Sequence, residues 1–163
     1  MSEIQISDLG IVTDSKFGLK TKGEREAPLP VTVEDINPDE AKEILIQFGY
    51  KEDTTGQASV HEAVERMRNG EQRYFTAKDP QTGKIVGLSS VSQHKDNTVY
   101  LEVLPDFQGR RIGPQLIDGL KQRYSRLSLE NTIGSNGHAF YENLGFRDEG
   151  MRGHMVWEKP EVK

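Results

Sequence analysis

The sequence predicts an α/β fold built as a single domain. Segments whose apolar residues alternate, as in half-buried strands, are interleaved with segments whose apolar residues recur every three or four positions, as in helices. The length of 163 residues lies within the usual size of one domain and is enough to bury a core. Strands and helices mixed in this way form a sheet with helices packed on its faces.

The first part of this domain is predicted to hold one strand and two helices. Residues 29–36 alternate as a strand does. The next helix, over 38–48, starts with an Asn-Pro pair, which suits a helix N-terminus. A second helix begins at Ser59, because Glu62 follows at the spacing of a capping box, and it stops at Gly70.

The rest of the chain is predicted to alternate between strands and helices. A turn-forming Asp-Pro-Gln-Thr-Gly segment separates two strands that we expect to form a hairpin. The predicted strands cover 72–78, 84–93, 98–104 and 127–131, the helices cover 114–124 and 137–144, and terminal strands follow from Phe146. The expected order is β-α-α-β-β-β-α-β-α-β.

Composition excludes several classes of protein. Cysteine is absent, which removes disulfides, thiolate nucleophiles and Cys-ligated metals. The four histidines are scattered without metal-ligand spacing, so we expect no metal. No apolar run is long enough to cross a bilayer, and the first residues lack the features of a secretory signal, so we expect a cytoplasmic protein. The net charge of −5 makes a nucleic-acid partner unlikely by composition.

Sequence pattern and charge are unevenly distributed along the chain. Residues 1–28 match no clear pattern and are interpreted as an N-terminal arm, which leaves 29–163 as the main domain. Residues 31–70 hold nine acids and four bases, which equals the whole net charge of the chain. This acidic region is either a solvated helical face or a surface that attracts a cationic partner.

The segment from Val103 to Leu116 is the most informative one. It runs strand, proline, short loop and helix, which aims backbone N–H groups at one point beside a helix N-terminus. Gly109 and Gly113 allow close approach of a ligand, and two arginines add positive charge between them. The arrangement fits a pyrophosphate. The alternative is an ordinary strand-to-helix connection with exposed arginines.

Two stretches in this half of the chain match one family. Residues 108–113 are Gln-Gly-Arg-Arg-Ile-Gly, and residues 139–146 are Ala-Phe-Tyr-Glu-Asn-Leu-Gly-Phe. The first resembles the acetyl-coenzyme A loop of the GNAT N-acetyltransferase superfamily, Gln/Arg-x-x-Gly-x-Gly/Ala, and the second resembles the family's later helix, Ala-x-Tyr-Glu-x-Leu-Gly-Phe. The chain departs from the pattern at Arg111, where the family has glycine, and Pro114 offers no N–H to a phosphate.

The resemblance implies a GNAT-like fold and an acetyl-CoA site. The fold would be a mixed, mostly antiparallel twisted sheet with helices on both faces and splayed central strands. A backbone N–H of Val103 or Leu104 would contact the thioester carbonyl. The full set of residues expected to bind acetyl-CoA is Leu101, Val103, Leu104, Gln108, Gly109, Arg110, Arg111, Ile112, Gly113, Asn131, Asn136 and Tyr141. Asn136 is also a suitable helix N-cap.

The implied reaction is acetyl transfer to a primary amine. Tyr141 matches the family tyrosine that protonates the departing thiolate, although an aromatic core position is the alternative. Glu102 and Glu130 are the candidate bases, and the residues leave the choice between them open. Each is otherwise a solvated acid at a strand end.

The acceptor and the partners are inferred more coarsely. In the family the first two helices form much of the acceptor wall, so the acidic region favours a cationic amine, either small or on a peptide. Homodimers are common in the family, and residues 1–28 are a candidate docking arm for a protein partner. The competing hypothesis is a GNAT-fold module without activity that acts through protein partners; Arg111 and Pro114 favour it.

Overall fold

The computed structural model describes residues 27–56, 58–131, 136–150 and 153–161. Within them, one sheet has the strand order β1-β2-β3-β4-β5-β7-β6. All neighbouring strands are antiparallel except β4 and β5, so the predicted α/β fold with a mostly antiparallel sheet is confirmed. The strands are β1 (Thr32–Asp35), β2 (Gln72–Lys78), β3 (Ile85–Ser92), β4 (Thr98–Val103), β5 (Arg126–Glu130), β6 (Arg147–Asp148) and β7 (His154–Glu158).

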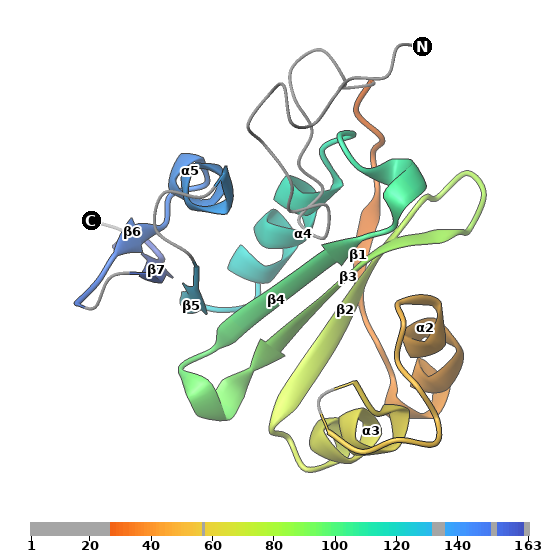
Figure 1. The fold of residues 1–163 in the computed structure, drawn as a ribbon. Coiled ribbons are helices and arrows are strands. Elements are labelled where there is room, and N and C mark those ends of the chain that lie inside the picture. The colour runs from red at the N-terminus through yellow and green to blue at the C-terminus, as the bar shows by residue number, and fades with distance from the viewer. Residues whose placement is uncertain (1–26, 57, 132–135, 151–152, 162–163) are drawn as a thin grey trace.

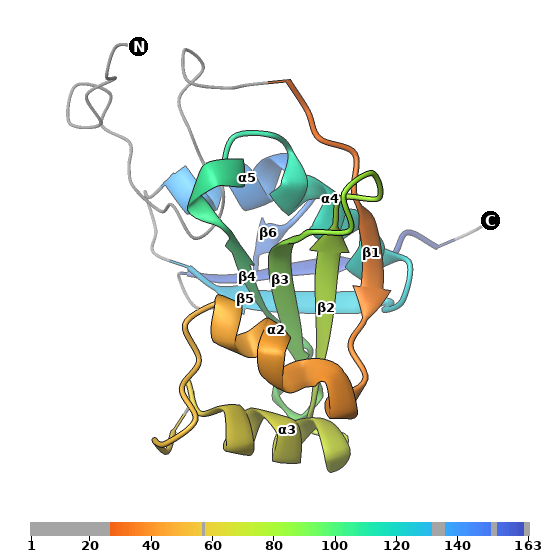
Figure 2. The same ribbon diagram turned by 90° about the vertical axis from the view of Figure 1, so that its right-hand side faces the viewer.

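Helices cover both faces of the sheet (Figures 1 and 2). On one face, α4 (Ile112–Lys121) packs over a core that includes Phe75, Leu101 and Val103, and α5 (Asn136–Asn143) extends this core over the β5–β7 side. On the other face, α2 (Ala41–Gln47) and α3 (Val60–Arg68) pack on a smaller cluster. No helix in the described ranges is long and apolar enough to span a membrane.

The larger differences from the predicted helix boundaries are the starts of α2 and α4. The helix expected over 38–48 is a 3-10 turn at Pro38–Glu40 followed by α2, which begins at Ala41. The helix expected from Pro114 begins at Ile112 instead, so Pro114 lies inside its first turn. An N–H there has no partner within the helix, so proline costs the helix no hydrogen bond.

The start of α3 shows half of the predicted capping box. Ser59 Oγ accepts from the Glu62 N–H at 3.2 Å, as predicted. The Glu62 carboxylate does not reach back to Ser59, because it accepts from the Gly56 N–H at 2.9 Å. The Ser59 N–H in turn donates to the Gly56 carbonyl at 3.2 Å. The cap therefore fixes the loop that precedes α3 as well as the helix.

The central strands β4 and β5 diverge, as predicted (Figure 1). They are paired only at Thr98 and Ser128, whereas β3 and β4 are paired over six residues. The base of this gap is tied by hydrogen bonds: Asn97 Nδ2 donates to the Arg126 carbonyl at 2.9 Å, and Ser128 Oγ donates to the Asp96 carbonyl at 2.7 Å. Arg126 also pairs with the Asp96 carboxylate at 2.8 Å. The strands therefore meet at a fixed point and separate beyond it.

The contact between α4 and β1 gives a test of this packing. A Cβ at Gly119 would lie 2.7–3.1 Å from Val33, whose β-branched side chain has little freedom to move. Gly119→Ala gains about 1 kcal/mol of helix propensity, but overpacking costs about 1–3 kcal/mol. We expect a net loss in the free energy of unfolding by urea denaturation. Asp118→Ala, an exposed site on the same helix, is the control and should lose nothing. A more stable Gly119→Ala protein would contradict this packing.

Candidate functional site

The edge of β4 that faces the gap offers unpaired backbone groups. Successive N–H groups of a strand point to opposite sides. The Leu104 N–H donates to the Val86 carbonyl of β3 at 2.9 Å, so the Val103 N–H points away from β3 and toward the gap. Of the two predicted donors to a thioester carbonyl, Val103 is therefore the one that the geometry favours. The side chains of Leu101 and Val103 are buried beneath α4.

The predicted phosphate loop lies between the end of β4 and α4. Gly109 has φ +81° and Arg111 has φ +64°, both in the left-handed region. The turn places residues 109–113 at the start of α4, and their backbone N–H groups donate to no described residue outside that helix. Gln108 is buried, and its Nε2 donates to the Val103 carbonyl at 3.2 Å. Gln108 thus holds the loop against the open edge of β4.

The conformation of Arg111 explains the family's preference for glycine at this position. Glycine adopts positive φ without cost, whereas other residues are strained there. Arg111 keeps the same backbone shape at an energetic cost, so the substitution preserves the turn. The loop therefore has the form that the resemblance implies in spite of its departure from the pattern.

The segment just before β1 packs against this loop. The Leu29 N–H donates to the Arg110 carbonyl at 3.0 Å, and Arg110 Nε donates to the Ala27 carbonyl at 3.0 Å. Gln115 on α4 bonds to both Leu29 and Val31 at 2.8 and 2.9 Å. One function of Arg110 is thus to hold residues 27–31. Residues 1–26, most of the predicted arm, lie outside the described residues.

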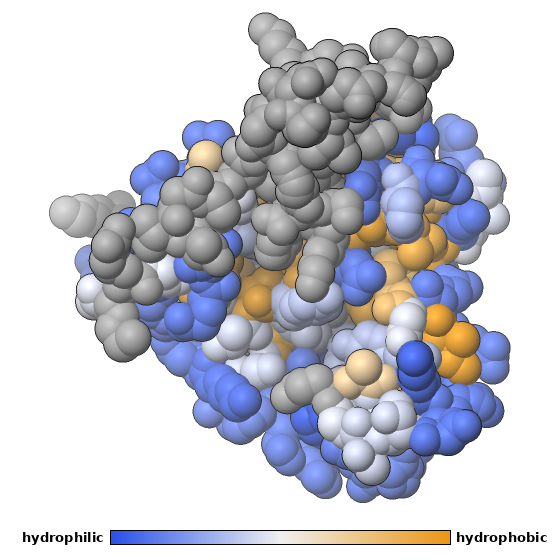
Figure 3. Space-filling model, in the orientation of Figure 1, coloured by the Kyte–Doolittle hydropathy of each residue, from blue (hydrophilic) through white to orange (hydrophobic). Residues whose placement is uncertain are grey.

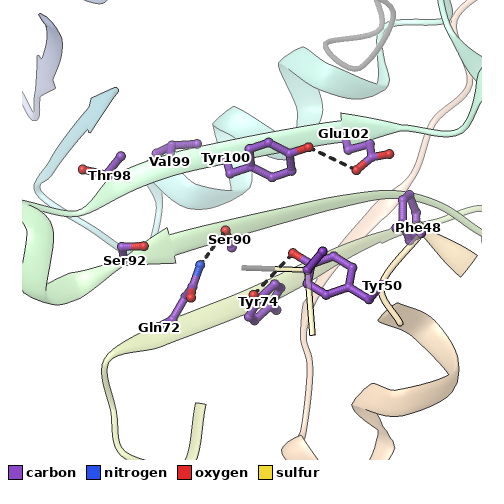
Figure 4. Close-up of a pocket in the computed structure, with 12 residues that line it drawn as sticks. Phe48, Tyr50, Gln72, Tyr74, Ser90, Ser92, Thr98, Val99, Tyr100 and Glu102 are labelled. Atoms are coloured by element: carbon purple, nitrogen blue, oxygen red, sulfur yellow. Dashed lines mark hydrogen bonds between the residues drawn. The ribbon is translucent and has the colours of Figure 1, made fainter. Parts of the chain in front are cut away.

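A pocket of about 360 Å³ opens on the opposite face of β4. Figure 4 shows the side chains of Tyr100 and Glu102, from alternate positions of the strand, above Tyr50 and Tyr74. Gln72, Ser90, Ser92 and Thr98 line one end, and Phe48 lies at the other end near Glu102. In the space-filling view, hydrophobic and pale residues gather in the middle of this side of the molecule, within a hydrophilic periphery (Figure 3).

Hydrogen bonds order the polar groups of this pocket. Tyr100 donates its hydroxyl to Glu102 Oε1 at 3.3 Å, and the Tyr50 and Tyr74 hydroxyls are 3.4 Å apart. Burial raises the pKa of Tyr100 to about 12, and the Glu102 carboxylate contributes to this shift. Burial also raises the pKa of Tyr50, with a contribution from Tyr74. Both phenols are therefore neutral at physiological pH and cannot act as bases.

The two candidate bases lie in different environments. Glu102 lines the pocket. Glu130, at the end of β5, has a side chain that is 67% exposed, and it pairs with His154 Nδ1. It is not among the residues that line the pocket. The geometry therefore favours Glu102, which sequence patterns alone did not distinguish from Glu130.

The remaining predicted residues lie around α5. Tyr141 is buried, and its ring packs edge to face against Phe140 and Phe146, with centroids 4.9 and 5.5 Å away. Tyr141 therefore lies in an aromatic core, the environment that was the alternative to a catalytic position. Its role as a proton donor stays a prediction. Asn131 lies against Gly137, whose added Cβ would be 3.1 Å from its Oδ1. Asn136 is the first residue of α5, one position earlier than the predicted helix start.

The acidic region from residue 31 to 70 does not supply the charge of this pocket. None of its nine acids lines the pocket. Four of them form ion pairs elsewhere: Glu34 with Lys78, Asp35 with Arg73, Asp39 with Arg68 and Glu52 with Lys42. The region contributes Phe48, Gly49, Tyr50 and Ala58 to the pocket instead. Among the described residues, the carboxylate that lines the pocket comes from β4, and the attraction of a cationic acceptor by the acidic region stays a prediction.

The tyrosines of the pocket were missed at the sequence level. Tyr100 and Glu102 are two residues apart on a predicted strand. Because side chains alternate between the two faces of a strand, the sequence was enough to predict that they share a face. Tyr50 and Tyr74 lie 24 residues apart and join the pocket only through the α2–α3 connection and β2. No local pattern brings them together.

The geometry of the loop suits an anion such as a pyrophosphate. It combines N–H groups at the start of α4, two left-handed residues and the arginine pair, which together suit an anion. The gap beside Val103 adds a place where an extended chain can approach an unpaired strand edge. The structure thus places a strand–loop–helix turn that suits an anion next to a splayed pair of strands.

Comparison with protein families identifies the domain. Residues 70–148 match the family model described as acetyltransferase (GNAT) domain. Residues 70–148 are therefore similar to a GNAT acetyltransferase domain, and both motifs lie within this stretch. A sequence comparison with curated proteins finds no match.

Solved structures agree on the fold. A putative acetyltransferase from Acinetobacter baylyi has a TM-score of 0.61 at 14% identity, over 79% of this chain and 93% of that one. A dodecameric spermidine N-acetyltransferase from Vibrio cholerae has a TM-score of 0.58 at 17% identity, over 79% of this chain and 94% of that one. A structure of the Vibrio enzyme with CoA and spermine has a TM-score of 0.54 at 18% identity, over 77% of this chain and 91% of that one.

The left-handed Arg111 gives a test of the loop. Arg111→Gly removes the side-chain strain at positive φ, so we expect the free energy of unfolding in urea to rise by up to about 1 kcal/mol. Arg111→Ala removes the same charge but keeps the strain, so it should not stabilise the protein. Equal stability of the two variants would mean that Arg111 is not strained.

Proposed function

We propose that the protein transfers an acetyl group from acetyl-CoA to a primary amine that is bound in the pocket beside Glu102. The observation that carries the proposal is that β4 borders both sites. Its backbone edge at Val103 faces the gap and the phosphate loop, while the neighbouring Glu102 side chain enters the pocket. A donor on one side and an acceptor on the other would meet at the end of this strand.

The phosphate loop would hold the coenzyme. The N–H groups of residues 109–113 would donate to the pyrophosphate, and Arg110 and Arg111 would add charge-assisted contacts. The Val103 N–H would donate to the thioester carbonyl oxygen, where negative charge develops during transfer. Gln108 would support this arrangement, because its bond to the Val103 carbonyl fixes the end of β4.

Glu102 would position the acceptor and remove its proton. Acetyl-CoA supplies the acetyl group as a thioester, so the amine nitrogen bonds to the carbonyl carbon, the C–S bond breaks, and coenzyme A leaves as a thiol. The carboxylate of Glu102 first pairs with the incoming ammonium and then accepts the proton that the amine must lose. Tyr141 is the proposed donor of the proton that the leaving sulfur takes up.

Solved relatives support an amine acceptor without defining it. The Vibrio cholerae structures are those of a spermidine N-acetyltransferase, and one of them is a complex with CoA and spermine. At this level of identity the likeness concerns the fold, so we take from it only the reaction type. A higher-order assembly, as in the dodecamer, is one candidate for the oligomeric state of this protein.

Calorimetric titration with acetyl-CoA tests the donor site. We expect one-to-one binding, which Arg110→Ala and Arg111→Ala each weaken by about tenfold or more, because each removes a charge-assisted contact. Arg147→Ala is the control, since Arg147 forms exposed ion pairs on β6 and carries the same charge. A dephosphorylated pantetheine fragment should bind the loop variants and the wild type equally. Absence of binding at millimolar acetyl-CoA would favour a module without activity.

Substitution of the two acids tests the base. Glu102→Gln keeps the shape of the side chain and removes its charge, so we expect a loss of turnover of about a hundredfold or more, measured by thiol release. Glu130→Gln should retain most of the turnover, because that carboxylate is exposed and lies outside the pocket. The opposite ranking would assign the base to Glu130. Equal, wild-type pH profiles for both variants would point to another group.

A further inference from the structure

The pocket beside β4 has a negative charge at one end only, where it can bind an ammonium group. Glu102 is the sole carboxylate among the twelve described residues that line it. Figure 4 shows Glu102 beside Phe48, with Thr98, Ser92 and Gln72 at the opposite end. Thr98 and Glu102 are four residues apart on β4, which corresponds to about 13 Å along a strand. A ligand whose ammonium pairs with Glu102 therefore meets no second carboxylate among the residues that line the rest of the pocket.

The middle of the pocket is aromatic. The Tyr50 and Tyr74 rings meet edge to face with centroids 6.2 Å apart, and Tyr100 faces them from β4. Tyr100 is 38% exposed, one of the two exposed large hydrophobic residues in the described chain. Its ring offers surface that an apolar ligand would cover. An aromatic ring of the ligand adds edge-to-face or stacked contacts beyond simple burial.

The far end is polar but offers no negative charge. Gln72 Nε2 donates to Ser90 Oγ at 3.0 Å, and Arg66 Nε donates to Gln72 Oε1 at 2.7 Å. A cationic side chain, Arg66, thus contacts Gln72 at this end. Ser92 and Thr98 add hydroxyl groups, which can donate to or accept from a neutral polar group. A second ammonium placed here would lose its hydration without gaining a carboxylate.

We propose that the acceptor is an amine with a single positive charge: a primary ammonium on an apolar, aromatic body that ends in an uncharged polar group, rather than a polyamine. This inference rests on the proposed function and defines its acceptor. Glu102 holds the ammonium, the three tyrosines cover the body, and the Gln72 end receives the polar group. The same end disfavours polyamines, because their further charges find no carboxylate among the described residues that line it.

Competition between two amines tests this assignment. We expect kcat/KM for tyramine to exceed that for spermidine by at least about tenfold, measured by thiol release with acetyl-CoA. Ser92→Asp introduces a carboxylate at the far end, so it should move the ratio toward spermidine by about tenfold, as one added ion pair predicts. Ser92→Asn is the matched control, because it changes size similarly and adds no charge, and it should leave the ratio near the wild-type value.

The aromatic part of the proposal has its own variants. Tyr100→Ala should raise KM for tyramine by about tenfold, because the ring loses a covering surface and a ring–ring contact. Tyr100→Phe keeps the ring and should restore KM. A KM unchanged by Tyr100→Ala would overturn the assignment of the aromatic body.

The outcomes separate this inference from the proposed function. Faster transfer to spermidine than to tyramine overturns the inference and leaves the acetyltransferase standing. If neither amine is acetylated, saturation-transfer NMR of the two amines with the full chain decides. Tyramine binding that exceeds spermidine binding and is lost in Tyr100→Ala then supports the inference while the proposed function fails. Absence of tyramine binding overturns the inference as well.

Discussion

The single point of pairing between β4 and β5 is the constraint on which the site depends. A neighbouring parallel strand normally forms hydrogen bonds with the N–H and C=O groups along a strand edge. Here the pairing stops after Thr98 and Ser128, and the bonds of Asn97 and Arg126 hold the strands together at that point. The edge of β4 beyond it keeps polar groups that need partners. Gln108 satisfies the Val103 carbonyl, and the Val103 N–H remains directed into the gap.

Strand alternation then couples two surfaces that differ in chemistry. The odd-numbered residues of β4 bury their side chains under α4 and turn their N–H groups to the gap. Tyr100 and Glu102 turn their side chains to the opposite face, where α2, α3 and the connection between them leave a pocket. One short strand thereby presents a hydrogen-bonding edge and a carboxylate at adjacent residues. The loop before α4 completes the arrangement, because its shape survives an arginine at a left-handed position.

Much of the fold was predictable, because its signals are local. The bounds of β2 match the predicted 72–78, and the cap at Ser59 follows from side-chain hydrogen bonding to a nearby N–H group. The start of α4 was placed too late, because Pro114 suggested the first helical residue when it is the third. The positions of the acids of residues 31–70 relative to the pocket were not predictable from the sequence. Charge counts along a chain do not record which acids pair with bases on other strands, as Asp35 does with Arg73.

The sequence by itself determined the class of fold, the family motifs and the loop that suits a phosphate, since each depends on residues that are neighbours in the chain. Only the tertiary structure distinguishes Glu102, which lines the pocket, from the exposed Glu130, because exposure and pocket lining depend on strands that diverge. It alone brought Tyr50 and Tyr74 under Tyr100, and it directed the N–H of Val103, not that of Leu104, toward the gap. These features arise from contacts between segments that are distant in the chain. Forming such contacts costs chain entropy, and this cost is offset only when the whole sheet assembles.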